Sequence, residues 1–289
     1  MKTRFSFKKS ASSVLLASIL IAPFSTWAAN DIVISSGVNG GMYQEYANNV
    51  AKVLKSKGHP NVTVINSLGS GENLKRLSTN EANIAFATLD AYSMYLKKGG
   101  SELTILSTLK DECGYLVAKK GSSISSEDDF QHPGKKIAIG EEGSGSAVMW
   151  SYMATLEPGY KNSTIVFSGG TMILNSLNLP NGPDALLFVT TKDNKTHKLI
   201  QAVNAKGSEL RFLDIDDRNL SDKLPNGNPV YTFETSQVCD KFFGCTVKTI
   251  CTKGAIFVQQ NNKELNSAFE DISDVLAISK STIIGDESK

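Results

Sequence analysis

Three polar loops rich in glycine contain the residues of this sequence that are best suited to hold a ligand. They read SSGVNGGMY at residues 35–43, NSLGSGEN at residues 66–73 and GEEGSGSA at residues 140–147. Each loop follows an apolar run and precedes a segment with helical periodicity. Backbone N–H groups at a helix start lack intrahelical partners and carry partial positive charge, so they bind anions. Glycine allows close approach of the backbone, and serine, asparagine and tyrosine side chains add donors.

The same loops also have a purely structural interpretation. Glycine and serine before a helix commonly serve only to turn the chain and to cap the helix. Binding is favoured because all three loops follow predicted strands, and ligands of open α/β sheets bind at the carboxyl ends of the strands. None of the loops matches a dinucleotide fingerprint, a G-K-[ST] phosphate loop or a G-x-S-x-G nucleophile elbow.

The sequence offers no clear catalytic constellation. His59 and His132 directly precede prolines, which places both histidines in turns. The acidic pairs Glu141–Glu142 and 216–217 are adjacent along the chain, which is typical of solvated carboxylates rather than of a catalytic pair. We therefore predict neither an enzyme nor a bound cofactor or metal. A secreted hydrolase remains an alternative that would need a base beside a nucleophile.

The elements that must position the loops alternate regularly along the chain. Apolar, β-branched runs predict strands at residues 31–37, 61–67, 82–90, 103–109 and 113–121, with amphipathic helices after the first three. This alternation predicts a mostly parallel sheet with helices on both faces. The pattern restarts near Lys135, and a late strand at 247–261 precedes a closing helix at 263–279. The sequence thus predicts two α/β lobes, with the tail returning to the first lobe.

The N-terminal residues read as a secretory signal peptide. Four basic residues precede an apolar core from Val14 to Phe24, which is shorter than the ~20 residues that span a bilayer. Small residues at Thr26 and Ala28 predict cleavage after Ala28 and export to the periplasm; an uncleaved anchor is the alternative. Cleavage leaves 26 basic against 29 acidic residues, a net charge of −3. That charge gives no general attraction to nucleic acid, and we predict no nucleic-acid partner.

The four cysteines all follow the predicted signal peptide, at positions Cys113, Cys239, Cys245 and Cys251. An even number of cysteines in an oxidising compartment favours two disulfides, for which three pairings are possible. A zinc site is the alternative, but the spacing lacks a C-x2-C pair and no histidine lies nearby.

An ordered set of motifs resembles a known family. GGMY at residues 40–43, GSGENLKRLSTNEANIAFATLD at 69–90, GKKIAIGEEGSGS at 134–146 and DALLFVT at 184–190 are similar to the TAXI-type solute-binding proteins. These proteins are the extracytoplasmic receptors of TRAP transporters. The resemblance covers most of residues 30–276. It implies a type II periplasmic binding protein, an α/β fold in which two lobes, each a mostly parallel sheet flanked by helices, close over a ligand.

The resemblance also implies the ligand, the partner and the binding residues. The ligand would be a small carboxylate such as glutamate or a related organic acid, and the partner a TRAP-type membrane permease driven by an ion gradient; we expect a monomer. An ABC-type receptor or a periplasmic ligand sensor are alternatives on the same fold. The residues carried over as ligand-binding are Gly40, Gly41, Tyr43, Gly69, Ser70, Asn73, Asp90, Ser144, Gly145, Ser146 and Thr190.

The fold implied by the resemblance further suggests lobe boundaries and a cysteine pairing. The first lobe would comprise residues 29–120 and 247–289, and the second lobe residues 121–246. Because the strand returning from the second lobe lies beside the strand that left the first, we predict Cys113–Cys251 near the hinge and Cys239–Cys245 as a small loop. The sequence departs from the family at VTTKDNK, residues 189–195, and retains only three arginines beyond the signal peptide. An arginine clamp on the ligand is therefore not predicted.

Overall fold

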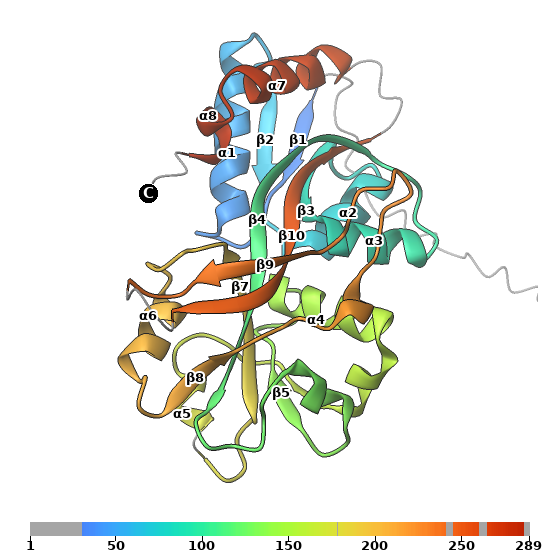
Figure 1. Ribbon diagram of the computed structural model, residues 1–289. Coiled ribbons are helices and arrows are strands. Elements are labelled where there is room, and N and C mark those ends of the chain that lie inside the picture. Colours follow the sequence, from blue (N-terminus) through green and yellow to red (C-terminus); the bar gives the residue numbers. More distant parts are fainter. Residues whose placement is uncertain (1–30, 178, 241–244, 260–264, 286–289) are drawn as a thin grey trace, which may run out of the picture.

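The structure is a computed structural model, and it describes residues 31–177, 179–240, 245–259 and 265–285. The predicted signal peptide at residues 1–28 lies outside the described residues. Within the described ranges, none of the helices combines the length and the apolar character that spanning a bilayer requires. Figure 1 shows two lobes, one above the other, connected by long strands.

The first lobe, at the top of Figure 1, is built from strand–helix units in chain order. Its short parallel strands pair in the order β2-β1-β3, and each is followed by a helix. The closing helices of the chain return to this lobe and pack against α1. The elements are β1 (Ile32–Ser35), α1 (Met42–Ser56), β2 (Val62–Ile65), α2 (Ser70–Ser78), β3 (Ile84–Thr88), α3 (Leu89–Lys97), α7 (Asn266–Ile278) and α8 (Ser281–Ile284).

The second lobe repeats the parallel theme with shorter strands. Strand β5 pairs in parallel with β6 on one side and with β7 on the other, and β8 pairs antiparallel with β4 (Thr104–Lys119). The elements are η1 (Glu127–Gln131), β5 (Lys136–Ala138), α4 (Gly145–Leu156), η2 (Pro158–Asn162), β6 (Thr164–Val166), α5 (Ile173–Ser176), β7 (Ala185–Thr191), α6 (Lys198–Ala205), β8 (Leu210–Leu213) and η3 (Arg218–Leu220).

Two long antiparallel strands, β4 and β10 (Thr246–Val258), run through both lobes. Near one end β10 pairs with β3 of the first lobe, whereas β4 pairs with β7 of the second lobe from Glu112 onward. The β4–β10 register shifts between Lys253 and Ala255 and again between Ile256 and Phe257. Strand β9 (Thr232–Gln237) pairs with the other end of β10. The two lobes therefore share one continuous sheet. The lobe boundaries predicted at residues 120 and 247 remain a proposal.

Both predicted disulfides are present in the structure. Cys113 on β4 lies directly opposite Cys251 on β10, and both residues are buried. This disulfide joins the two long strands close to where they pass between the lobes. The second disulfide links Cys239, after β9, to Cys245, before β10.

The core lies on both faces of the shared sheet, as the alternation of strand residues requires. In the first lobe, Ile34 and Phe86 pack toward α1, α7 and α8, whereas Ala85 and Ala87 pack toward α2 and α3. In the second lobe, α4 covers one face of the sheet and α5 and α6 cover the other. The α/β fold with two lobes is thus confirmed.

Two details of the predicted elements differ from the structure. The strands predicted at residues 103–109 and 113–121 form the single strand β4, because its pairing with β10 and β7 carries the strand through the charged residues between them. Strand β9 was not predicted, since its sequence TFETSQ is largely polar.

Candidate functional site

A cavity of about 610 Å³ lies where the two lobes meet, and it is lined by all three polar loops. The first lobe contributes residues of the loops after β1 and β2, and the second lobe contributes the loop after β5. The floor of the cavity includes Glu112 of the shared strand β4. The volume falls within the range of small-molecule sites, roughly 300–1,000 Å³.

The N-termini of three helices converge on this cavity. Residues in the first turn of α1 (Met42 and Tyr43), of α2 (Ser70) and of α4 (Gly145 and Ser146) all line it. The first N–H groups of a helix have no intrahelical acceptor, and the aligned peptide dipoles make that end positive. The cavity can therefore hold an anionic group from both lobes at once.

The serine hydroxyls of the site are occupied in holding these helix starts. Ser70 Oγ accepts a hydrogen bond from the N–H of Thr88 at 3.2 Å. Ser144 caps α4 by accepting from the N–H of Ala147 at 3.3 Å. Ser146 Oγ accepts from the N–H of Val189 on β7 at 3.1 Å. These contacts fix the helix starts, whose first backbone N–H groups are donors available to a ligand.

The structure brings most of the residues carried over from the resemblance to the cavity wall. Those that line the cavity are Gly41, Tyr43, Gly69, Ser70, Ser144, Gly145 and Ser146. The other four are not among the lining residues: Gly40, Asn73, Asp90 and Thr190. The part that any of these residues plays in binding remains a prediction.

Each of those four residues has a structural role. Gly40 adopts a positive φ of 75°, and its N–H donates to the side chain of Gln44. Asp90 is buried at the start of α3, where it accepts from its neighbour's N–H and, at 3.0 Å, from the hydroxyl of Tyr231. Burial raises the pKa of the Asp90 carboxyl. The Thr190 hydroxyl accepts from the side chain of Asn194.

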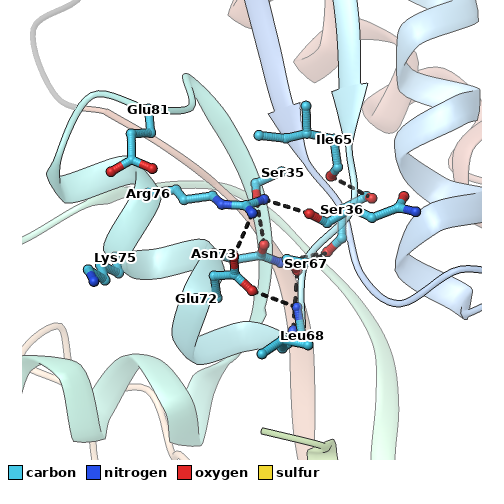
Figure 2. A network of polar contacts seen from close by, with 12 residues as sticks. Ser35, Ser36, Ile65, Ser67, Leu68, Glu72, Asn73, Lys75, Arg76 and Glu81 are labelled. Carbon is cyan, nitrogen blue, oxygen red and sulfur yellow. Dashed lines mark hydrogen bonds and ion pairs between the residues drawn. The ribbon is translucent and has the colours of Figure 1, made fainter. Parts of the chain in front are cut away.

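A network of polar contacts holds the second loop, as Figure 2 shows. Glu72 reaches back along α2 to accept a hydrogen bond of 2.7 Å from the N–H of Leu68, just before the helix start. Its carboxylate also pairs with Arg76, one turn later. The Arg76 guanidinium donates in turn to the backbone carbonyl of Asn66 at 2.7 Å and to the hydroxyl of Ser35 at 3.0 Å.

Asn73 lies in the same network but points into the protein. It is fully buried, and its amide nitrogen donates to the carbonyl oxygens of Ser36 and Phe86, both at 2.6 Å. Its amide oxygen accepts from Ser35. Asn73 therefore ties α2 to the ends of β1 and β3, and in this conformation none of its polar atoms is free for a ligand.

Glu112 was missed by sequence reasoning. It is only 8% exposed, and its Oε1 atom accepts a hydrogen bond of 2.6 Å from the Tyr43 hydroxyl. Burial raises the pKa of the Glu112 carboxyl to about 7; the Tyr43 hydrogen bond lowers it and the charge of Asp90 adds to the rise. The residue falls in the gap between two predicted strands, so no periodicity pointed to it. Its position just before Cys113 was the only available signal.

The two lobes touch at the mouth of the cavity. A Cβ atom added at Gly69 would lie 2.6 Å from the carbonyl oxygen of Gly143 on the opposite lobe, closer than such atoms approach. Gly69 also has a φ of 137°, a conformation that only glycine adopts readily. Glycine at this position thus permits the close approach of the first and second lobes. The structure therefore shows the lobes in a closed arrangement.

The described part of the chain holds no group of three or more histidine, cysteine or acidic side chains arranged to bind a metal. Both disulfides use cysteines that a zinc site would have needed.

Comparison with known proteins agrees with this architecture. No curated protein matches the sequence significantly. Among solved structures, XAC2383 from Xanthomonas citri, bound to ATP, superposes with a TM-score of 0.55 at 10% identity, over 88% of this chain and 86% of that one. PhnD1 from Prochlorococcus marinus, in complex with methylphosphonate, superposes with a TM-score of 0.53 at 11% identity, over 86% of this chain and 84% of that one.

These likenesses establish the fold as that of two-lobed periplasmic binding proteins. The sequence profile of one family, described as NMT1-like, matches residues 34–261. The match includes all three polar loops, both long strands and every residue named above as lining the cavity. The chain therefore belongs to the NMT1-like family.

Proposed function

We propose that this protein is an extracytoplasmic solute receptor that binds a small carboxylate between its lobes and delivers it to a TRAP-type membrane permease. The observation that carries the proposal is the convergence of three helix N-termini, from both lobes, on one cavity. An anion held at this point interacts with both lobes at once. It therefore favours the closed arrangement over an open one, which is how hinged receptors respond to a ligand.

The energies involved are modest. Moving a receptor from mostly open to mostly closed takes about 5 kcal/mol of differential binding. Hydrogen bonds to a charged group contribute about 1.5–3 kcal/mol each. Two or three N–H groups from α1, α2 and α4 are therefore sufficient to close the lobes on a carboxylate.

The motif resemblance supports the TRAP assignment and the ligand class, glutamate or a related organic acid. The same resemblance, together with the N-terminal apolar core, supports a periplasmic location after cleavage at Ala28. The lobes would then correspond to residues 29–120 with 247–289, and to 121–246. A receptor of this kind acts by binding and release, without chemistry on the ligand and as a monomer.

A thermal-shift screen of carboxylates, amino acids and sulfonates tests the proposal. A ligand at 100 times its dissociation constant adds about 2.7 kcal/mol to stability. Gly145→Val should abolish the shift, because a side chain there projects toward Val189 and Glu112 inside the cavity. Gly71→Ala is the control, since a Cβ atom at that position meets nothing within 4 Å. A shift that survives Gly145→Val would place the ligand elsewhere and overturn the proposal.

A further inference from the structure

One carboxyl oxygen at the floor of the cavity has no partner. Glu112 Oε1 is engaged by the Tyr43 hydroxyl, whereas Oε2 makes no hydrogen bond or ion pair with any described residue. A Cβ atom placed at Gly145, in the first turn of α4, would lie 3.9 Å from Oε2. The free oxygen therefore points toward the part of the cavity where the ligand would lie against α4.

The cavity has no positive side chain to balance this group. Its lining residues include three acidic ones, Glu112, Glu141 and Glu142, and among the described residues that line it none is lysine, arginine or histidine. The other titratable groups that interact with Glu112 are Tyr43 and Tyr46 on α1 and Asp90 on α3, and none of them supplies positive charge. A buried carboxylate without a cation is costly, which is why such groups mark functional sites.

The site thus offers two opposite kinds of contact within one cavity. The helix starts favour an anionic group, and Glu112 favours a cationic one. Apolar side chains of Val38, Met42, Leu68 and Val189 line the remaining wall. A ligand that bears a carboxylate alone would satisfy the helices but would leave Oε2 of Glu112 unpaired beside it.

We propose that the ligand carries a protonated amine that binds Oε2 of Glu112, in addition to the carboxylate held by the helix starts. The substrate class is then the zwitterionic amino acids, and dicarboxylates without an amine are excluded. This inference rests on the proposed function and narrows it. The ammonium group supplies the positive charge that the cavity lacks, and the hydroxyl of Tyr43 holds the carboxyl in place to receive it.

A different role for Glu112 would be purely structural. The carboxyl could serve only to fix Tyr43 at the hinge, with the N-terminus of α4 stabilising its charge. In that case an amine on the ligand would bring no advantage, and replacing Glu112 would change affinity equally for compounds with and without an amine. Matched ligands that differ only in the amine therefore separate the two roles.

Isothermal titration calorimetry at pH 8 provides the test, with the twenty L-amino acids and two matched pairs as probes. The pairs are L-leucine with 4-methylpentanoate and L-glutamate with glutarate. We expect an amino acid to bind at least tenfold more tightly than its deaminated counterpart. In Glu112→Gln the difference should fall to threefold or less. Glu45→Gln, which removes an exposed carboxylate from the first turn of α1 outside the cavity lining, should keep the full difference.

Proton exchange gives a second readout that a structural role would not produce. With a pKa near 7, Glu112 is partly protonated in the free protein at pH 7 and must ionise to pair with an ammonium group. Binding of an amino acid at pH 7 should therefore release a fraction of a proton, seen as a dependence of the binding enthalpy on the buffer. This release should be absent in Glu112→Gln.

The outcomes are distinct for the two proposals. Equal or tighter binding of glutarate or 4-methylpentanoate overturns the ammonium inference but leaves a carboxylate receptor standing. Failure of every amine-bearing probe also overturns the inference. If no carboxylate of any kind binds, the proposed function fails with it. Circular dichroism and thermal unfolding of Glu112→Gln show whether the variant is folded, and the buffer dependence of wild-type binding is decisive on its own.

Discussion

The hydroxyl of Tyr43 donates a hydrogen bond of 2.6 Å to Oε1 of Glu112, joining α1 of the first lobe to the strand that both lobes share. The two residues are 69 positions apart in the sequence. The bond has a direct electrostatic effect, because it stabilises the ionised carboxylate and so opposes the rise in pKa that burial causes. The ionisation of the Glu112 carboxyl at the floor of the cavity thus depends on Tyr43, a residue of the first polar loop.

Replacing Glu112 by glutamine should stabilise the protein without ligand at high pH. The carboxyl has a pKa of about 7 in the folded protein against an ordinary value of 4.5. The stability gained from its neutral form is fully present below pH 4.5 and is lost as the pH rises through about 7. At pH 8 the wild type should be less stable than Glu112→Gln by about 3 kcal/mol, and at pH 4.5 by much less. Urea unfolding at both pH values measures the difference, and equal stability at pH 8 would contradict it.

Tyr43→Phe should raise the pKa of Glu112 further, because the hydrogen bond that lowers it is removed. The pH at which stability falls should then move above 7. The measurement is the free energy of unfolding across pH 5–9. Tyr46→Phe on the same helix is the matched control, since the structure shows no hydrogen bond from Tyr46 to Glu112. A profile unchanged by Tyr43→Phe would show that the bond does not form in solution.

The sequence predicted the positions of the three loops but not the direction of every side chain in them. The glycine–serine composition and the onset of helical periodicity identified the starts of α1, α2 and α4 correctly. Asn73 and Asp90 face the interior because of the rotation of α2 and α3 about their axes, which packing against β3 and β10 decides. A single sequence contains no measure of that rotation.

Glu112 could not be predicted for a related reason. Residues 110–112 read KDE, which breaks the apolar alternation and indicates a loop. Pairing with β10 and β7 on either side continues the strand through these charges, so tertiary contacts override the local pattern. Cys113 and Cys251 were paired correctly because the position of a returning strand follows from topology rather than from local composition.

Gly69→Ala should weaken ligand binding by preventing full closure. The added Cβ atom would lie 2.6 Å from the carbonyl oxygen of Gly143, so the lobes would have to separate. Small-angle X-ray scattering with saturating ligand should give a larger radius of gyration than in the wild type. Gly40→Ala is the control for backbone strain, since Gly40 also has a positive φ but nothing lies within 4 Å of its Cβ position. Wild-type affinity and compactness in Gly69→Ala would contradict the prediction.

The two disulfides should differ in their contribution to stability. Cys113–Cys251 spans 138 positions and Cys239–Cys245 spans 6. Chain entropy predicts a loss of about 5 kcal/mol on removing the first and about 2 kcal/mol on removing the second. Paired serine variants compared by denaturant unfolding measure both. Removing Cys113–Cys251 should cost more stability than removing Cys239–Cys245. A larger loss of stability on removing Cys239–Cys245 would contradict the chain-entropy explanation.

Asn73→Ala should lower stability by about 2–4 kcal/mol, because it removes the hydrogen bonds that the Asn73 amide donates to the buried carbonyls of Ser36 and Phe86. Asn48→Ala, at an exposed position of α1, should change stability by less than about 0.5 kcal/mol. Chemical denaturation gives both values. Should Asn73→Ala keep full stability yet lose ligand binding, the side chain would have to leave its buried position to contact the ligand.

The paired strands β4 and β10 also limit how the two lobes can move relative to each other. Paired strands flex readily out of their plane but resist sliding past one another, because sliding would break the hydrogen-bond ladder between them. The Cys113–Cys251 disulfide adds a covalent link between the two strands, close to where they pass between the lobes. The two lobes should therefore open and close along a single path. Each closure should return Gly69 to the same position opposite Gly143.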